Sequence, residues 1–225
     1  MTDAPHPRLD ELIAVLARLR APGGCAWDRE QTHESLVQYL LEETYELVEA
    51  IESGSRDDLV EELGDVLYQV IFHADIAAHA TDRSFDIEDV AERMTAKMVG
   101  RHPHVFAEST AETAADVVAL WEDVKAVEKP GRTSVLDGIP LAMPSLLLAA
   151  KLVGRAERVG VAPATPTPPV SESVASPESE EALGSLLLSI VADARSAGLD
   201  PERALRGALR DLRTDIRAAE SPAQR

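Results

Sequence analysis

Four carboxylate residues at helical spacing set the strongest constraint on what this chain folds into. Two belong to the string LEETYE at 41–46, two belong to the string EELGD at 61–65, and a turn, SGSR at 53–56, separates the strings. The four are Glu43, Glu46, Glu62 and Asp65. Residues three apart share one face of a helix, so an antiparallel helix pair brings all four carboxylates together.

Two of these acids interrupt apolar rows, where an ionised carboxylate without a partner is costly. Glu43 follows Leu40 by three residues and precedes Leu47 by four, and Glu62 interrupts the next helix in the same way. An oxygen-only ligand set favours Mg²⁺, Mn²⁺ or Ca²⁺ over Zn²⁺. We predict a Mg²⁺ site and phosphate chemistry. The adjacent Glu42 could orient a water, bind a second metal or face solvent.

The composition favours packed helices. Of the 225 residues, 45% are hydrophobic, which is enough to build a core. Only 4% are aromatic, whereas β-sheets are enriched in aromatic residues. Apolar residues recur at helical spacing, so we predict an all-α fold with a compact bundle over about 8–160. Helices are expected at 8–20, 34–53, 57–80, 86–102, 114–128, 141–159, 181–198 and 201–220.

A few residues carry more specific local expectations. Asp28 and Gln31 have the spacing of a capping box, and Asp86 can cap the helix that Pro103 ends. Gly64 lies inside a predicted helix, where glycine costs about 1 kcal/mol relative to alanine. We therefore expect another helix to approach closely at Gly64.

The chain divides into three parts by composition. Residues 1–160 form the predicted catalytic helical domain with a connecting helix at its end. Residues 161–180 are rich in Pro and Ser and read as a flexible linker, and 181–225 read as a small helical segment.

The charge balance limits the partners. A net charge of −18 argues against binding to nucleic acid polymers and to anionic membranes, although a small anionic substrate remains compatible with it. Cys25 is the single cysteine, and neither a signal peptide nor an apolar run of about 18 residues is present. We expect a cytoplasmic protein.

Together these strings resemble a known family. LEETYE followed by ELGD resembles the EExxE and ExxD signature of MazG-type all-α nucleoside triphosphate pyrophosphohydrolases. Supporting strings lie in order along the chain: GCAWDREQTH at 24–33, KMVGRHPHVF at 97–106 and WEDVK at 121–125. The resemblance covers most of residues 20–160.

The resemblance implies hydrolysis of a nucleoside triphosphate to a monophosphate and pyrophosphate, with a role in clearing damaged or surplus nucleotides. It also implies Mg²⁺, with Mn²⁺ as a substitute, and a homodimer that completes the bundle. By position in the motif, the four acids correspond to Mg²⁺ ligands, with Glu42 beside them. Lys97 and Arg101 correspond to triphosphate-binding residues, and Trp121 and Lys125 to nucleotide contacts. Core packing is an alternative role for Trp121.

A second unit of the same kind is recognisable but degenerate. Aligning 61–65 with 181–185 pairs Glu62 with Ala182 and Asp65 with Ser185, so both ligands are missing. In the same comparison Lys97 pairs with Asp211, and Arg101 pairs with Asp215, so both predicted phosphate-binding cations are replaced by acids. We expect this segment to serve packing or dimer contacts rather than catalysis.

Two groups of alternatives remain open from the sequence. All-α dUTPases and phosphoribosyl-ATP pyrophosphohydrolases carry similar acidic helices, but the strings HPHVF and WEDVK favour the MazG type. A non-catalytic nucleotide-binding or interaction module is the alternative from another class, and the intact acidic set argues against it.

Overall fold

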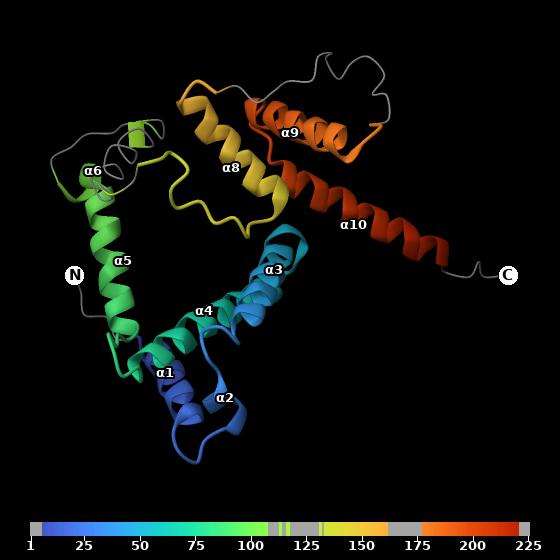
Figure 1. The fold of residues 1–225 in the computed structure, drawn as a ribbon. Coiled ribbons are helices and arrows are strands. Elements are labelled where there is room, and N and C mark those ends of the chain that lie inside the picture. The colour runs from blue at the N-terminus through green and yellow to red at the C-terminus, as the bar shows by residue number, and fades with distance from the viewer. Residues whose placement is uncertain are drawn as a thin grey trace. The chain divides into compact units, whose positions relative to one another are not determined.

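The computed structural model describes residues 6–107, 113, 116–117, 131, 133–161 and 177–220. This part of the chain contains helices and no strand, which confirms the predicted all-α fold (Figure 1). The chain divides into two compact units, residues 1–128 and 129–225. Most of the helix predicted at 114–128 lies outside the described residues, as does most of the predicted linker.

The helices of the first unit are α1 Pro7–Arg20, α2 Ala26–Glu30, α3 Val37–Ser53, α4 Arg56–Ala78, α5 Ile87–Arg101 and α6 Pro103–Phe106. The helices predicted at 8–20, 34–53, 57–80 and 86–102 are present, and two short helices, α2 and α6, were not predicted. The helix α3 begins three residues later than expected because Ser35 bonds locally. Its hydroxyl accepts from the backbone N–H of Thr32 at 2.9 Å and donates to Oε1 of Gln31 at 2.7 Å. Such local bonds compete with helix formation.

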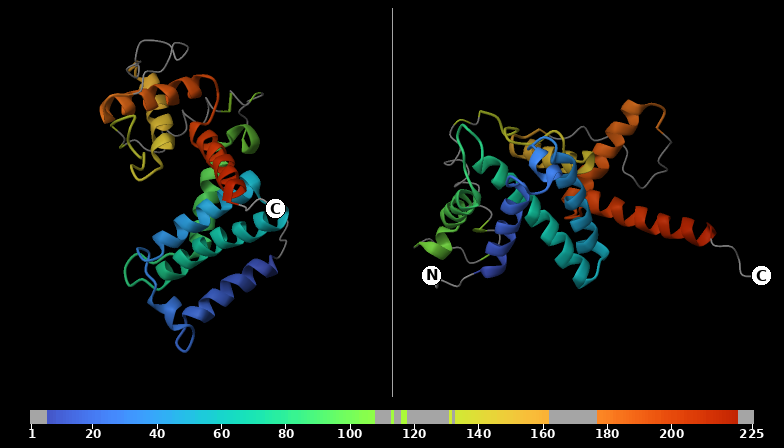
Figure 2. Two further views of the ribbon diagram at one scale, coloured as in Figure 1. Left: turned by 90° about the vertical axis from the view of Figure 1, so that its right-hand side faces the viewer. Right: turned by 90° about the horizontal axis from the view of Figure 1, so that it is seen from below.

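A tight turn sets α3 and α4 antiparallel, and the two helices run side by side in Figures 1 and 2. A Cβ atom added to Gly54 would lie 2.7 Å from the Cα of Ala50, so only glycine fits there. Ser55 and Asp58 then form a capping box: the Ser55 N–H donates to Oδ2 of Asp58 at 2.7 Å, and the Ser55 hydroxyl accepts from the Asp58 N–H at 3.2 Å.

The core of this unit lies where α1 packs on the C-terminal half of α4. Leu16, Leu36, Ile71 and Phe72 are each at most 2% exposed. Beside them, Nε of Arg20 donates to Oδ2 of Asp75 at 2.6 Å, with side chains only 11% and 13% exposed. Arg20 also donates to the carbonyl oxygen of Asp28. A buried charge needs such compensation, so this ion pair specifies how α1 meets α4.

One local expectation is wrong, one is confirmed and one stays a prediction. Among the described residues, no atom lies within 4 Å of a Cβ added at Gly64, so the expected close approach of a helix there stays a prediction. Asp28 does not start a helix: α2 begins at Ala26 after Cys25, and the Asp28 side chain is buried within α2. The expected cap at Asp86 is confirmed, because its side chain accepts from the backbone N–H groups of Glu88 and Asp89.

The second unit consists of α8 Ser145–Arg158, α9 Glu180–Ser196 and α10 Pro201–Glu220, which pack on one another. Val153 and Val191 are buried here. The Arg195 side chain of α9 pairs with Glu157 of α8 at 3.3 Å. The sequence predicts α8 as a connecting helix at the end of the first domain, and in the structure it packs with α9 and α10. The predicted domain bounds at 160 and 180 stay predictions.

Among the described residues, no single helix is both long enough and apolar enough to cross a bilayer. By length and composition only, α9 and the part of α10 up to Arg217 would together be long and apolar enough, as a pair bent by 107°.

Two histidines join the segment before α3 to α4. The Nδ1 atoms of His33 and His73 lie 2.8 Å apart, the ring centroids are 5.1 Å apart and the ring planes differ by 4°. These values place the rings edge to edge in one plane, with the two nitrogens facing each other. One ring must donate its N–H and the other accept, so at least one of them is neutral.

The pair predicts a loss of stability in mild acid. Burial lowers the pKa of His73, and the neighbouring His33 lowers it further. A pKa below the unfolded value of about 6.5 means that the unfolded chain binds more protons, so this contribution is lost as the pH falls below about 6.5. We expect His73→Gln to reduce the difference in unfolding free energy between about pH 7.5 and 5.5, measured by urea denaturation.

His6→Gln is the control for this comparison, because His6 is exposed before α1. It should keep the pH dependence of the wild type. An equal pH dependence in His73→Gln and the wild type would show that the histidine pair does not contribute.

Candidate metal centre and nucleotide site

Three carboxylates from two helices converge in the first unit. Glu43 of α3 and Glu62 and Asp65 of α4 are half-buried, and each offers an oxygen within 4.8 Å of the others. The α3–α4 turn produces this arrangement by placing the middle of α3 beside the first half of α4. The structure thus brings together three of the four acids that the spacing singles out.

One oxygen of this group lacks any compensation. Oε2 of Glu62 is shielded from solvent and accepts no hydrogen bond. A buried acceptor without a donor costs about 1–3 kcal/mol, and more when it is charged. A cation bound between the three carboxylates would satisfy this oxygen, so the residues present fit a metal ion.

The acids also repel one another. Burial raises the pKa of Glu43, and the charges of Asp65 and Glu46 raise it further. Burial likewise raises the pKa of Glu62, with additional repulsion from Glu46 and Asp65. The protein therefore holds these side chains at a cost that a bound cation would offset.

Glu46 stands at the edge of this group. It is exposed and does not belong to the three-carboxylate cluster, yet its charge acts on both Glu43 and Glu62. It lines a pocket of about 400 Å³ at the end of the hairpin. The pocket is lined by Glu46, Glu49, Ala50, Ser53, Gly54, Asp58 and Glu62. Glu42 is exposed on α3.

The chemistry of the donor set limits the ion. All the ligand atoms are carboxylate oxygens, which suit hard cations such as Mg²⁺, Mn²⁺ and Ca²⁺. No histidine or cysteine belongs to the cluster among the described residues, so a zinc site is disfavoured.

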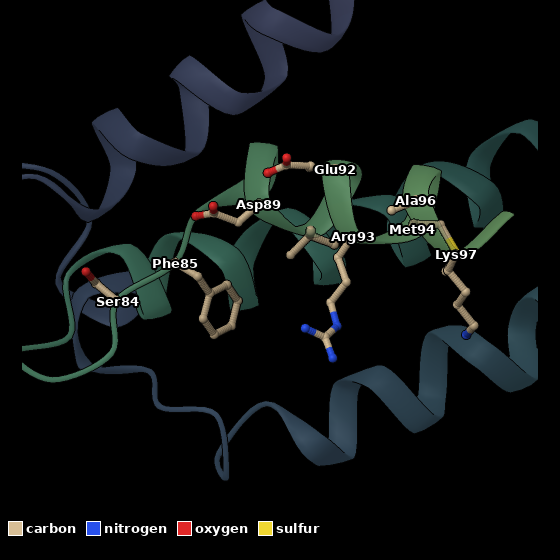
Figure 3. Close-up of a pocket in the computed structure, with 9 residues that line it drawn as sticks. Ser84, Phe85, Asp89, Glu92, Arg93, Met94, Ala96 and Lys97 are labelled. Carbon is tan, nitrogen blue, oxygen red and sulfur yellow. The ribbon is translucent and has the colours of Figure 1, made fainter. Parts of the chain in front are cut away.

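The predicted phosphate-binding cations lie on α5. Lys97 is exposed and lines a pocket of about 850 Å³ along this helix (Figure 3). Arg101 is half-buried in the last turn. Trp121 and Lys125, the predicted nucleotide contacts, lie outside the described residues.

Two residues of this pocket were missed by the sequence reasoning. Arg93 and Phe85 line it together with Lys97. The signal for Arg93 was its spacing of four residues from Lys97, which places both on one helix face. An exposed phenylalanine gives no comparable signal, because single exposed apolar residues are common.

Comparison with known proteins identifies the family of the first unit. The MazG nucleotide pyrophosphohydrolase domain matches residues 31–106. The matched region contains the acidic cluster and both predicted cations of α5. The resemblance drawn from the short strings is thereby confirmed.

Relatives match over most of the chain. The nucleoside triphosphate pyrophosphohydrolase/pyrophosphatase MazG of Thermotoga maritima is 42% identical over 89% of this chain and 81% of its own length. The nucleoside triphosphate pyrophosphohydrolase of Escherichia coli K12 is 37% identical over 95% of this chain and 87% of its own length. An uncharacterised 26.1 kDa protein of Streptomyces cacaoi is 48% identical over 97% of this chain and 85% of its own length.

Among solved structures, a MazG-related protein from Thermotoga maritima is similar with a TM-score of 0.44 and 28% identity, over 53% of this chain and 97% of that one. The family assignment comes from the sequence relatives, which span both units at 37% identity or more. This chain belongs to the MazG nucleotide pyrophosphohydrolase family of enzymes.

Proposed function

We propose that this protein hydrolyses nucleoside triphosphates to nucleoside monophosphates and pyrophosphate, using Mg²⁺ held by Glu43, Glu62 and Asp65. The shielded oxygen of Glu62 carries the metal assignment, because it accepts no hydrogen bond from a described residue and a cation between the three carboxylates would compensate it. Family membership and the activity for which the relatives are named support the reaction. Mn²⁺ has the same ligand preference and would substitute.

The side chains have different roles in this proposal. Glu43, Glu62 and Asp65 would hold the ion, and Glu46 adds a fourth carboxylate in the pocket beside them. Bound there, Mg²⁺ would neutralise phosphate charge and acidify a water molecule. Lys97 and Arg101 bind the triphosphate, and their positive charge stabilises the charge that develops on pyrophosphate as it leaves. Trp121 and Lys125 contact the nucleotide.

The cellular role we propose is removal of damaged or surplus nucleotides in the cytoplasm. A net charge of −18 disfavours nucleic acid polymers and anionic membranes, leaving free nucleotides as the partners. A screen of ordinary and damaged triphosphates tests this role; equal turnover of all of them would contradict a preference for damaged ones.

We also propose a homodimer formed through the outer face of the α3–α4 hairpin. Both helices expose rows of large apolar side chains at helical spacing. They are Val37, Leu41 and Tyr45 on α3, and Val60, Leu63, Leu67 and Val70 on α4, each at least 40% exposed. Exposed apolar patches of this kind mark interaction sites, and a second copy would bury them.

Activity depends on the acidic cluster in this proposal. We expect Glu62→Gln to lower the rate of Mg²⁺-dependent pyrophosphate release on the order of a hundredfold or more, since electrostatic stabilisation is usually the largest catalytic contribution. Glu61→Gln, at the exposed neighbouring position, is the matched control and should keep the rate within a few fold.

EDTA should abolish pyrophosphate release and excess Mg²⁺ should restore it. Near-normal turnover of Glu62→Gln would overturn the metal assignment. Binding of nucleotides by the wild type without any pyrophosphate release would favour a non-catalytic nucleotide-binding module.

The melting temperature should reveal metal binding at this cluster independently of catalysis. Because the pKa of Glu62 is raised in the folded protein, ionisation at neutral pH destabilises the fold, and a neutral Gln relieves this repulsion. We expect metal-free Glu62→Gln to melt at or above the temperature of the metal-free wild type, while Mg²⁺ raises the melting temperature of the wild type alone. Equal Mg²⁺ stabilisation of both proteins would place the ion elsewhere.

The dimer is tested by light scattering. We expect a molar mass of about twice 24.2 kDa for the wild type. Leu67→Lys should shift it toward the monomer, because a charge at a buried apolar contact is costly. Leu9→Lys is the matched control, since Leu9 on α1 is 39% exposed and Leu67 is 40% exposed. A monomeric wild type would contradict the dimer.

A further inference from the structure

One face of α5 presents two cations without partners. Arg93 and Lys97 both line the pocket of about 850 Å³, and neither forms an ion pair with a described residue. They are four residues apart, so their Cα atoms lie about 6 Å apart along the helix. Figure 3 shows both side chains projecting to the same side of α5. In a chain with a net charge of −18, such a face is a local attraction for anions.

The two acids that also line this pocket do not cancel the cations. Oδ2 of Asp89 accepts from the backbone N–H of Asp86 at 2.9 Å, so this carboxylate is committed to the capping box of α5. Glu92 projects from the opposite side of the helix in Figure 3. Among the described residues neither acid pairs with Arg93 or Lys97, so both cations stay available to a bound anion.

An aromatic ring lies toward the other end of the same pocket. Phe85, just before the first turn of α5, is 44% exposed, and its ring projects to the same side as the two cations (Figure 3). Along this face the order is Phe85, Arg93, Lys97, with Arg101 in the last turn. An exposed ring can stack on a nucleobase, and the cations that follow it suit a chain of phosphates.

We propose that a nucleoside triphosphate lies lengthwise along this face, with Arg93 joining Lys97 as a phosphate-binding residue and Phe85 contacting the base. The assignment rests on the proposed function and adds Arg93 and Phe85 to its substrate contacts. In this orientation Arg93 binds the phosphate nearest the ribose. The aromatic ring makes affinity depend on the nucleoside as well as on the phosphates.

Calorimetry with two probes separates these roles in the full-length protein with Mg²⁺ present. The probes are a non-hydrolysable nucleoside triphosphate analogue and inorganic tripolyphosphate, which has no base. Arg93→Ala should weaken the binding of both about tenfold, as expected for the loss of a charged hydrogen bond. Phe85→Leu should weaken only the nucleotide analogue, and Arg93→Lys should recover part of the affinity.

Arg18→Ala is the matched control, because Arg18 is exposed on α1. It should bind both probes like the wild type, and every variant should keep the wild-type melting temperature and its response to Mg²⁺. Wild-type affinity in Arg93→Ala, or equal losses for both probes in Phe85→Leu, would overturn this inference while leaving the hydrolase intact. A wild type that neither binds nor hydrolyses nucleotides would instead overturn the proposed function.

Discussion

The packing of α3 against α4 is the contact on which the candidate site depends. A tight turn at Gly54 and the reciprocal bonds of Ser55 and Asp58 set where the second helix starts. That start determines the register, and the register brings Glu43 beside Glu62. A shift of one residue would turn a carboxylate away by about 100°, the rotation between successive helix residues.

The first unit treats its buried charges in two different ways. Arg20 and Asp75 neutralise each other at 2.6 Å where α1 meets α4. The acids at the other end repel one another, and Oε2 of Glu62 has no partner. The surrounding packing holds the three carboxylates together against their mutual repulsion, and a bound cation would offset that cost. Helix α4 thus contributes Asp75 to an ion pair with Arg20 and contributes Glu62 and Asp65 to the carboxylate cluster.

The α5 helix carries the cations that we propose to bind the phosphates. Its capping box ties Asp89 to Asp86, which removes one carboxylate from the face that carries Arg93 and Lys97. A metal ion and a cationic helix face would together receive a polyphosphate in a chain that is otherwise strongly acidic. Membership of the MazG family makes that polyphosphate a nucleotide in our proposal.

The sequence by itself determined the helical class, the cap at Asp86 and the acids of the site, because helix spacing and interrupted apolar rows are local properties. Glu43 and Glu62 stood out for that reason. The close approach expected at Gly64 stays a prediction, because it depends on where other segments of the chain lie. Only the tertiary structure joined His33 to His73, forty residues apart, and left one Glu62 oxygen without a partner among the described residues. These features depend on how distant segments pack and how side chains are buried, which local spacing does not encode.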